Sequence, residues 1–262
     1  MKSNAFIHLF KTPLNYYIYD VNKNAIVRID KSVYDYLQNT EGPEPEQMAK
    51  LRQEGYLSEK RPKKIEHPMT RRLEHELNNN IEQMTLQVTK QCNFRCAYCV
   101  YGEVAFDLQR RHDSDFMTYE TAKKAIDFYA QHSKDQTEAI IAFYGGEPLL
   151  AYPLIEKAIL YSEEVLKGKK ILFSMTTNAS LLTPEKARFL FEHNCHVLVS
   201  LDGPSEVQNA SRRFAIDGKG SFDIVYHNLQ RIIEDVPDAI SHLSINSVID
   251  LRNKYEDVIH FF

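Results

Sequence analysis

From Met84 onward, the sequence alternates between short apolar runs that favour β-strands and longer stretches with helical periodicity. The strand candidates are residues 84–89, 139–144, 171–176, 196–201 and 243–249. Such alternation predicts a parallel sheet whose strands are joined by right-handed helical crossovers. A partial barrel and an open doubly wound sheet both satisfy this pattern. Both architectures place a functional site at the carboxyl ends of the strands.

The segments between these strands carry helix signals. Apolar residues recur at three- and four-residue spacing in residues 122–129 and 154–165. Thr183 followed by Pro184 is typical of a helix start, and Ser221 is a candidate cap for the helix after it. A last helical pattern covers residues 253–262, so five strand–helix units are expected.

The beginning of the chain has a different pattern. Three short apolar runs separated by turn signals precede two helical patterns, at residues 31–40 and 44–57. We therefore expect a small α+β domain over residues 1–57. Residues 58–83, which begin with the charged stretch SEKRPKKIEH, are expected to form a linker with a short helix, and residues 84–262 a larger domain.

Composition and charge exclude several classes of protein. The 262 residues include 36 Asp and Glu against 32 Lys and Arg, which argues against a nucleic-acid-binding or anionic-membrane-binding protein. No run of 18 apolar residues indicates a membrane span. The start of the sequence also lacks the pattern of a signal peptide, so a cytoplasmic location is expected.

Three of the four cysteines lie close together, directly after the first predicted strand of the larger domain. Cys92, Cys96 and Cys99 form a C-x3-C-x2-C pattern, and thiolates this close in sequence must converge on one small group. A structural zinc ion or an ordinary ferredoxin-type cluster takes four protein ligands. A [4Fe–4S] cluster held by three cysteines leaves one iron open. A zinc site completed by a remote histidine such as His112 is the alternative.

The fourth cysteine, Cys195, immediately precedes a predicted strand, whereas the other three follow one. In a parallel sheet these positions lie on opposite rims, separated by a strand length of roughly 17–20 Å. Cys195 is therefore expected to be a buried structural thiol.

The C-x3-C-x-aromatic-C pattern, in which Tyr98 is the aromatic residue, resembles the signature of the radical S-adenosylmethionine (radical SAM) superfamily. The resemblance implies a (β/α)6 barrel, of which five units are seen here, so we expect a partial barrel in an apparently truncated chain. It implies a [4Fe–4S] cluster and S-adenosylmethionine (SAM) as cofactors. Reduction of the cluster by an external electron donor would then yield a 5′-deoxyadenosyl radical that abstracts hydrogen from a substrate.

The ends of the later strands carry further matches to this family. Gly145-Gly146-Glu147-Pro148 resembles the GGEP segment, which contacts the methionine amino group of SAM. Thr177 and Asn178 follow the third strand of the larger domain, and Ser200 ends the fourth. The resemblance implies these cofactor-binding residues: Tyr98, Gly145, Gly146, Glu147, Thr177, Asn178, Ser200, Asp202 and Arg212.

The segment after Asp202 departs from the family pattern. Peptide-modifying members carry a His-Asp pair before the arginine that matches Arg212, and this sequence has Gln208 and Asn209 instead. The departure leaves Arg213 as a competitor for the same role. No catalytic residue is assigned from the sequence.

Residues 6–37, within this first domain, resemble the leading segment of SPASM-type maturases of Cys-rich ribosomal peptides. The resemblance implies a winged-helix-like domain that binds a precursor leader peptide by β-strand addition. It also implies that the enzyme installs a thioether or related crosslink in that peptide. The alternatives are a structural role for the first domain, a sulfatase-activating-type or other protein-modifying radical SAM enzyme, and a non-catalytic zinc-stabilised peptide-binding module.

Overall fold

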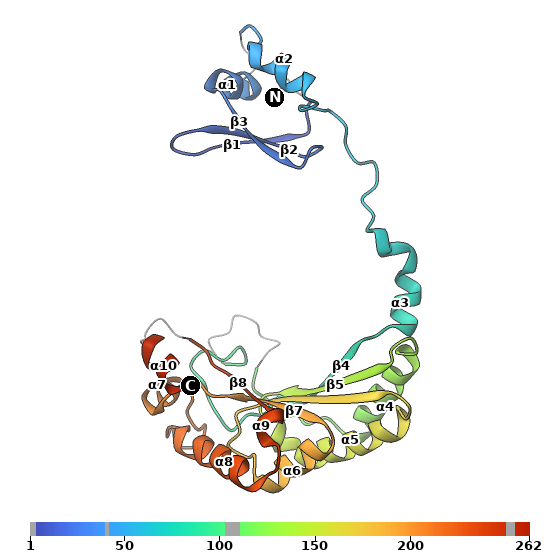
Figure 1. Ribbon diagram of the computed structural model, residues 1–262, viewed down its shortest axis with the longest axis vertical. Helices are drawn as coiled ribbons and strands as arrows, with labels where there is room; N and C mark the ends of the chain where they lie inside the picture. The colour runs from blue at the N-terminus through green and yellow to red at the C-terminus, as the bar shows by residue number, and fades with distance from the viewer. Residues whose placement is uncertain (1–3, 40–41, 103–110, 250–254) are drawn as a thin grey trace. The chain divides into compact units, whose positions relative to one another are not determined.

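The computed structural model describes residues 4–39, 42–102, 111–249 and 255–262, and the chain divides into two compact units (Figure 1). The smaller unit is Met1–Thr70 and the larger is Arg71–Phe262. The division falls inside the segment 58–83 that the sequence marks as a linker. This segment contains the helical turn η1 (Pro68–Arg72) and helix α3 (Leu73–Asn79).

The smaller unit is an antiparallel sheet packed against two helices, as its sequence pattern predicts. Within the described residues the strand order is β1 (Ile7–Lys11), β2 (Tyr16–Asp20), β3 (Ala25–Ile29), followed by α1 (Lys31–Asn39) and α2 (Glu46–Gln53). Ile18 on the central strand and Val33 and Leu37 on α1 are buried in one core. Because β2 is paired on both sides, β1 and β3 are the edge strands of this sheet.

The buried carboxylate of Asp20 connects the β2–β3 hairpin to the segment that follows α2. Asp20 is fully buried, and its Oδ2 accepts a hydrogen bond of 2.7 Å from the backbone N–H of Leu57. Its Oδ1 accepts a second bond, of 2.9 Å, from the N–H of Lys23 in the β2–β3 turn. Asp20 thus holds the segment after α2 against the hairpin.

The larger unit contains a parallel sheet in the described residues. Its strands are paired in chain order: β4 (Gln83–Thr89), β5 (Glu138–Gly145), β6 (Lys170–Thr177), β7 (Cys195–Ser200) and β8 (Leu243–Asn246). All five predicted strands are therefore confirmed. The last strand is shorter than the expected 243–249, and a short helix that the sequence pattern did not indicate, α9 (Ala239–His242), precedes it.

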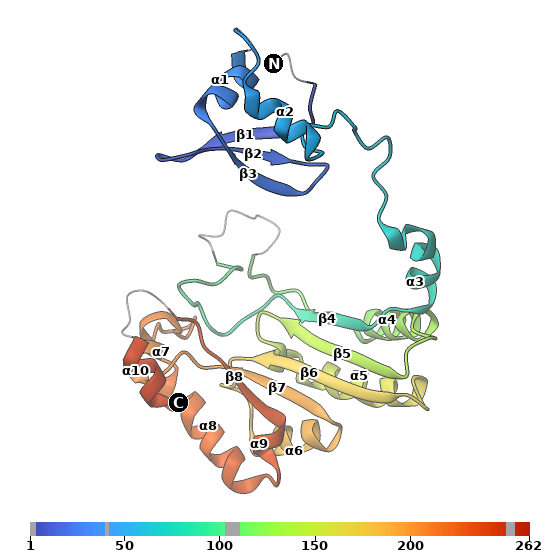
Figure 2. The ribbon, with the colours of Figure 1, turned by 45° about the horizontal axis from the view of Figure 1, so that its top comes forward.

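The crossover helices decide between the two predicted architectures. In Figures 1 and 2, helices α4, α5, α6 and α8 all lie on the same side of the sheet. A doubly wound sheet has helices on both faces, so the unit is a partial barrel. The helices are α4 (Tyr119–His132), the turn η2 (Pro148–Ala151) with α5 (Tyr152–Val165), α6 (Pro184–Glu192), α7 (Ser205–Ser211), α8 (Phe222–Asp235) and α10 (Tyr255–Phe261).

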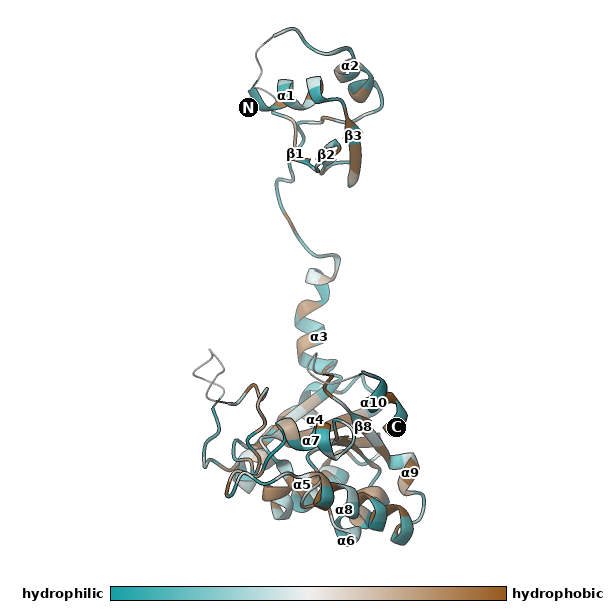
Figure 3. Ribbon diagram, turned by 90° about the vertical axis from the view of Figure 1, so that its left-hand side faces the viewer, coloured by the Kyte–Doolittle hydropathy of each residue, from teal (hydrophilic) through white to brown (hydrophobic). Residues whose placement is uncertain are grey.

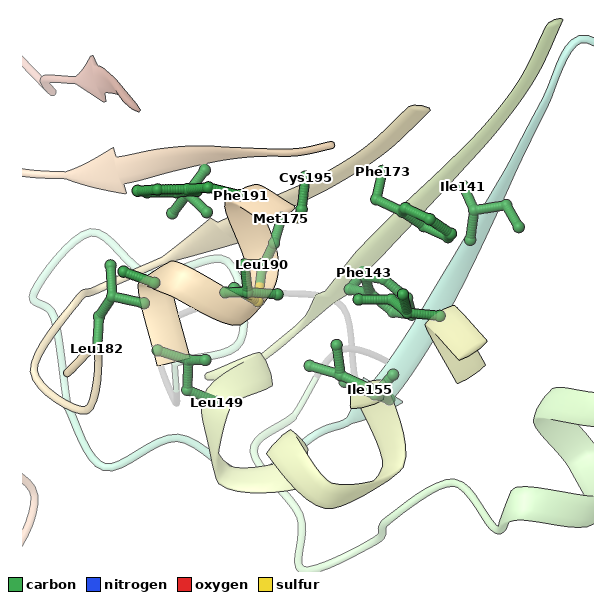
Figure 4. Packing of buried hydrophobic residues seen from close by; sticks show 14 of the residues in the cluster. Ile141, Phe143, Leu149, Ile155, Phe173, Met175, Leu182, Leu190, Phe191 and Cys195 are labelled. Carbon is green, nitrogen blue, oxygen red and sulfur yellow. The ribbon is translucent and has the colours of Figure 1, made fainter. Parts of the chain in front are cut away.

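The main core lies between the sheet and these helices, because alternate strand residues point toward the helices. Phe143 on β5 and Phe173 on β6 stack with ring centroids 6.1 Å apart, close to Ile141 and Ile155 (Figure 4). Cys195 begins β7 and is fully buried in the same core, as predicted. In Figure 3 the helices of this unit carry both hydrophilic and hydrophobic segments, as helices with one buried face do.

Two predicted helix starts have different outcomes. The hydroxyl of Thr183 accepts a hydrogen bond from the N–H of Lys186 and caps α6, as predicted. Ser221 stands at the start of α8 but forms no capping bond, so that prediction is wrong. Its buried hydroxyl donates instead to the carbonyl oxygen of Arg212, at 2.8 Å.

The last predicted helix is found as α10, although residues 253 and 254, where its pattern begins, lie outside the described residues. Residue 40, the end of the first helical pattern, also lies outside them. Among the helices that the structure describes, none combines the length and the apolar character needed to cross a membrane.

Candidate functional site

The cysteine segment lies at the carboxyl end of β4 and shares one cavity with the ends of the other strands. This cavity has a volume of about 380 Å³. Its walls come from the cysteine segment, the end of β5, the end of β6, Ser200 at the end of β7, and β8. The lining residues are Cys92, Phe94, Cys96, Tyr98, Cys99, Val100, Tyr101, Tyr144, Gly145, Gly146, Thr176, Thr177, Asn178, Ser200, Arg212, Asn246 and Val248.

The glycine pair after β5 allows the backbone to pack directly against the cysteine segment. A Cβ atom at Gly145, where φ is +149°, would lie 2.1 Å from the carbonyl oxygen of Thr89. A Cβ at Gly146 would lie 2.3 Å from the carbonyl oxygen of Gln91. Backbone N–H groups of Gly146 and Glu147 donate to these same two oxygens, at 3.0 and 2.9 Å. Only glycine lets the two segments approach this closely.

Glu147 is fully buried and does not line the cavity. Its Oε1 accepts hydrogen bonds from the hydroxyl of Thr177, at 2.6 Å, and from the N–H of Leu149, at 3.0 Å. Its Oε2 accepts from the N–H of Asn178, at 2.7 Å. Burial raises the pKa of this carboxyl above its ordinary value, although the three donors favour the ionised form. Glu147 therefore joins the ends of β5 and β6 from behind the cavity wall.

A second buried carboxylate, that of Asp202, likewise lies behind the cavity wall and bonds to residues that line it. Its Oδ2 accepts a 3.0 Å bond from Nε of Arg212 and another bond from the hydroxyl of Tyr98. Its Oδ1 accepts from the N–H of Val248, at 3.0 Å. Asp202 is 1% exposed and is absent from the cavity wall, whereas Tyr98 and Arg212 line it.

Arg212 is held on two sides. Its guanidinium carbon lies 5.3 Å from the centre of the Tyr98 ring, within the range of a cation–π contact. Its positive charge also lies beside the Cys96 thiol, whose pKa it lowers against the effect of burial. Arg213, the competing candidate, is exposed and donates to the carbonyl oxygen of Gly218. The structure therefore brings Arg212, and not Arg213, to the cavity.

Three polar side chains on the cavity wall are available to a ligand. They belong to Ser200, Thr176 and Asn246, at the ends of three neighbouring strands. Among the described residues, none of the three side chains forms a hydrogen bond. Ser200 was expected here from the sequence. Thr176 and Asn246 were missed, although strand alternation points Thr176 to the opposite face from Thr177.

Gln208 and Asn209, the two residues that depart from the family pattern, do not line the cavity but form hydrogen bonds within the fold around it. Gln208 is fully buried, and its Oε1 accepts a 2.9 Å bond from the N–H of Asp202. Asn209 accepts a 2.9 Å bond from the N–H of Phe222 and so caps α8, the role expected of Ser221. No local sequence pattern indicates these contacts, because both partners lie in other segments of the fold.

Asn93 was also missed. Its Oδ1 accepts a 2.9 Å bond from Nδ2 of Asn178, and its Nδ2 donates to the hydroxyl of Ser180 at 2.8 Å. An asparagine in position two of a cysteine motif is easily taken for a spacer. Here it joins the cysteine segment to the end of β6.

The three cysteines suit an iron–sulfur cluster better than a single metal ion. Thiolates around one zinc ion, with Zn–S near 2.3 Å, lie within about 4 Å of each other. In the part of the chain that the structure describes, no three His, Cys, Asp or Glu side chains are close enough to share one ion. A cluster instead gives each thiolate its own iron. The zinc site through His112 therefore has no support, although His112 Nε2 lies 3.7 Å from Cys99 Sγ.

Burial at two of these thiols, Cys92 and Cys96, also favours a cationic group beside them. It raises the pKa of Cys92 to about 12 and that of Cys96 to about 11, the latter in spite of the nearby positive charge of Arg212. A metal centre supplies the positive charge that deprotonates such thiols. The donor set therefore fits an iron cluster.

A partial βα barrel with three cavity-lining cysteines after its first strand, surrounded by polar strand ends, is an arrangement suited to holding a metal cluster beside a polar small molecule. The sequence model of the radical SAM superfamily matches residues 86–262, which is more than half of the chain. The protein therefore belongs to the radical SAM superfamily. This family uses a [4Fe–4S] cluster together with SAM.

Curated relatives include several modifying enzymes of this family. A radical SAM cyclopropyl synthase, TigE, of Paramaledivibacter caminithermalis is 29% identical over 209 residues, which are 75% of this chain and 42% of that protein. A serine-type anaerobic sulfatase-maturating enzyme of Bacteroides thetaiotaomicron is 35% identical over 141 residues, 53% of this chain and 33% of the relative. The chain thus spans less than half the length of these relatives.

Solved structures show the same fold. Native anSMEcpe with bound AdoMet has a TM-score of 0.60 and 25% identity, and the match covers 69% of this chain and 48% of that chain. The same enzyme with bound AdoMet and the Kp18Cys peptide has a TM-score of 0.59 at the same identity, covering 69% of this chain and 47% of that chain. The predicted α/β fold with a partial barrel is confirmed.

Proposed function

We propose that this protein is a radical SAM enzyme that modifies a ribosomally made peptide. The observation that carries the proposal is the convergence of the three cysteines and four strand ends on one cavity of about 380 Å³. Cys92, Cys96 and Cys99 are the proposed cluster ligands. When bound, the cluster supplies the electron that cleaves SAM and so generates the radical for hydrogen abstraction from the substrate.

The cavity wall divides into parts suited to different groups of SAM. The Arg212 guanidinium and the Ser200 hydroxyl both line the wall and match a carboxylate, because a guanidinium binds carboxylates through N–H donors. The end of β5 at Gly145 and Gly146 lines the part of the wall that we assign to the methionine amino group. Thr177 and Asn178 line the wall beside Cys92, and Tyr98 lines it beside Arg212.

Two of the expected cofactor-binding residues do not line the cavity. Glu147 and Asp202 do not reach the cavity, and their carboxylates are fully used by protein donors. We propose that both are positioning residues: Glu147 holds Thr177 and Asn178 in place, and Asp202 holds Arg212 and Tyr98. Neither needs to touch SAM to affect its binding.

Peptide substrates are supported by the relatives and by the smaller unit. The neighbouring enzyme anSMEcpe is known with a bound peptide, and sulfatase-maturating enzymes are among the relatives. We propose that the smaller unit is a winged-helix-like peptide-recognition domain over about residues 1–57. Within its described residues, the edge strands β1 and β3 each pair on one side only. An extended leader peptide adds to such an edge through main-chain hydrogen bonds.

Sulfatase-type activation of a serine or cysteine is the second candidate function, favoured by the 35% identity to the serine-type enzyme.

Anaerobic reconstitution with iron and sulfide tests the enzyme class. Wild-type protein should bind about four irons per chain and, with a reductant acting as external electron donor, cleave SAM to 5′-deoxyadenosine. Cys96→Ala should lose both properties. Retention of the full iron content by Cys96→Ala would show that the cluster assignment is wrong.

Mass spectrometry of peptides separates the two candidate reactions. Precursor peptides encoded beside the gene should lose a pair of hydrogen atoms for each thioether formed. Peptides carrying a sulfatase-type serine or cysteine site are the competing substrates. Hydrogen exchange on the full chain tests the smaller unit, because a bound leader peptide should protect amides of β1 or β3.

A further inference from the structure

Cys99 has a side-chain hydrogen-bond partner that lies outside the cysteine segment. Nε2 of His112 lies 3.7 Å from Cys99 Sγ, within hydrogen-bonding range for sulfur. The N–H of Tyr101 is 3.4 Å from the same sulfur. The backbone N–H of His112 also donates to the carbonyl oxygen of Tyr101, at 3.2 Å, and the two rings lie 5.9 Å apart. His112 is thus fixed against the loop that carries Cys99.

Cys92 has a comparable pair of donors. The N–H of Phe94 lies 3.4 Å from its sulfur, and Nδ2 of Asn178 lies 3.9 Å away. Asn178, however, lines the cavity and holds Asn93, so a change there would disturb several contacts. His112 does not line this cavity. It therefore allows the effect of one sulfur hydrogen bond to be measured separately.

The direction of the hydrogen bond follows from the chemistry of a metal ligand. A thiolate that binds iron has no proton to give, so the proton lies on Nε2 and the histidine donates. Reduction adds a negative charge to an iron–sulfur cluster, and part of this charge resides on the sulfurs. An N–H donor therefore stabilises the reduced form more than the oxidised form, which raises the reduction potential.

We propose that His112 is a positioning residue that donates an N–H···S hydrogen bond from Nε2 to the cluster-binding thiolate of Cys99 and thereby raises the reduction potential of the cluster. The proposal rests on the proposed function through the assignment of Cys99 as a ligand. It adds that the ease of the one-electron reduction is set in part by a side chain that does not line the proposed SAM cavity.

The test is an EPR-monitored reductive titration of the reconstituted full chain with dithionite as the electron source. His112→Phe keeps an aromatic ring and removes the donor, whereas His112→Gln keeps an N–H group. We expect His112→Phe to make reduction about tenfold less favourable, a negative shift of about 59 mV for one electron. His112→Gln should recover most of this shift. His227→Phe, on the exposed surface of α8, is the matched control and should leave the midpoint unchanged.

A second measurement keeps the proposal testable if His112→Phe does not assemble a cluster. Histidine labelled with ¹⁵N should produce a weak ¹⁵N coupling in the pulsed EPR spectrum of the reduced wild-type cluster, and His112→Gln should lack it. An unchanged midpoint in a cluster-containing His112→Phe, or no ¹⁵N coupling in the wild type, would overturn the proposal. A strong coupling typical of a directly bound imidazole would overturn it too. Failure of the proposed function is distinct, because the wild type would then bind no cluster at all.

Discussion

Arg212 donates from Nε to Oδ2 of Asp202 at 3.0 Å, and both side chains are almost completely buried. The same oxygen of Asp202 accepts from the hydroxyl of Tyr98, which belongs to the cysteine motif. One carboxylate therefore orients an aromatic ring beside the proposed cluster and a guanidinium at the proposed SAM carboxylate. Its removal should affect both groups together.

We expect Asp202→Ala to lower the free energy of unfolding by about 3–5 kcal/mol, because it leaves a buried guanidinium without its counter-charge. Affinity for SAM should fall as well, since Arg212 loses its orientation. Urea denaturation and equilibrium binding of SAM to the reconstituted protein measure the two effects. Arg213→Gln, which changes the exposed neighbour, is the control and should change neither; a stable Asp202→Ala with wild-type affinity would contradict this account.

The glycine pair predicts a specific steric effect. Gly146→Ala puts a Cβ 2.3 Å from the Gln91 carbonyl oxygen, so the cysteine segment must move. We expect a loss of about 1–3 kcal/mol in stability and reduced retention of iron during gel filtration. Gly168→Ala is a useful comparison, because that residue has φ of +97° but no atom within 4 Å of an added Cβ. It should cost stability through backbone strain and retain iron normally. Equal iron loss in both variants would show that the close approach is not the cause.

Glu147 should give the stability of the protein a characteristic pH dependence. Since burial raises its pKa in the folded state, the folded protein retains a proton that the unfolded chain has already lost above pH 4.5. The free energy of unfolding of the wild type, relative to Glu147→Gln, should therefore fall as the pH rises from 4.5, and level off beyond the folded pKa. Urea denaturation at several pH values measures this difference. A difference that is constant with pH would rule out a raised pKa.

Cys195 should not contribute to iron binding, in contrast to the other three cysteines. It is fully buried on the far rim of the sheet, and burial raises its pKa to about 12. We expect Cys195→Ala to keep the iron content of the wild type and to lose about 1–2 kcal/mol of stability through lost packing. Alkylation of the native, metal-free chain should leave Cys195 unmodified. Loss of iron in Cys195→Ala would identify it as a fourth ligand.

Asp20→Ala should destabilise the smaller unit without affecting the cluster site. The substitution leaves the N–H of Leu57 without its buried acceptor, which costs about 1–3 kcal/mol. Hydrogen exchange of β1 to β3 should accelerate, while iron content and SAM cleavage stay at the wild-type level. Asp30→Ala, at an exposed position just after β3, is the control. Slower leader-peptide modification by Asp20→Ala alone would link this unit to substrate recognition.

The sequence predicted the strands of the larger unit well because apolar runs and helix periodicity alternate with little ambiguity. Periodicity could not choose between a barrel and a doubly wound sheet, since both bury the same residues of each strand. That choice depends on which face of the sheet the helices cover. The short helix α9 was missed because it has only one turn and no apolar face to reveal it.

Several residues that the sequence indicates line the cavity, but their arrangement around it could not be predicted. The cysteine spacing and the GGEP segment are local patterns, so they are visible in a sequence. The positions of Glu147 and Asp202 behind the wall depend on contacts between residues 30 and 46 positions apart, such as Glu147 with Thr177 and Asp202 with Val248. Gln208 and Asn209 show the same limit, because their partners Asp202 and Phe222 are found only in the fold.

The main-chain hydrogen bonds from Gly146 and Glu147 to Thr89 and Gln91 hold the end of β5 rigidly against the cysteine segment. A displacement of the cysteine segment must carry the glycine pair with it, because these bonds contain no side chain that can rotate to absorb the motion. The separation between the proposed electron source and the proposed methionine site is therefore set by peptide geometry. A change in another wall of the cavity would leave this separation unaltered.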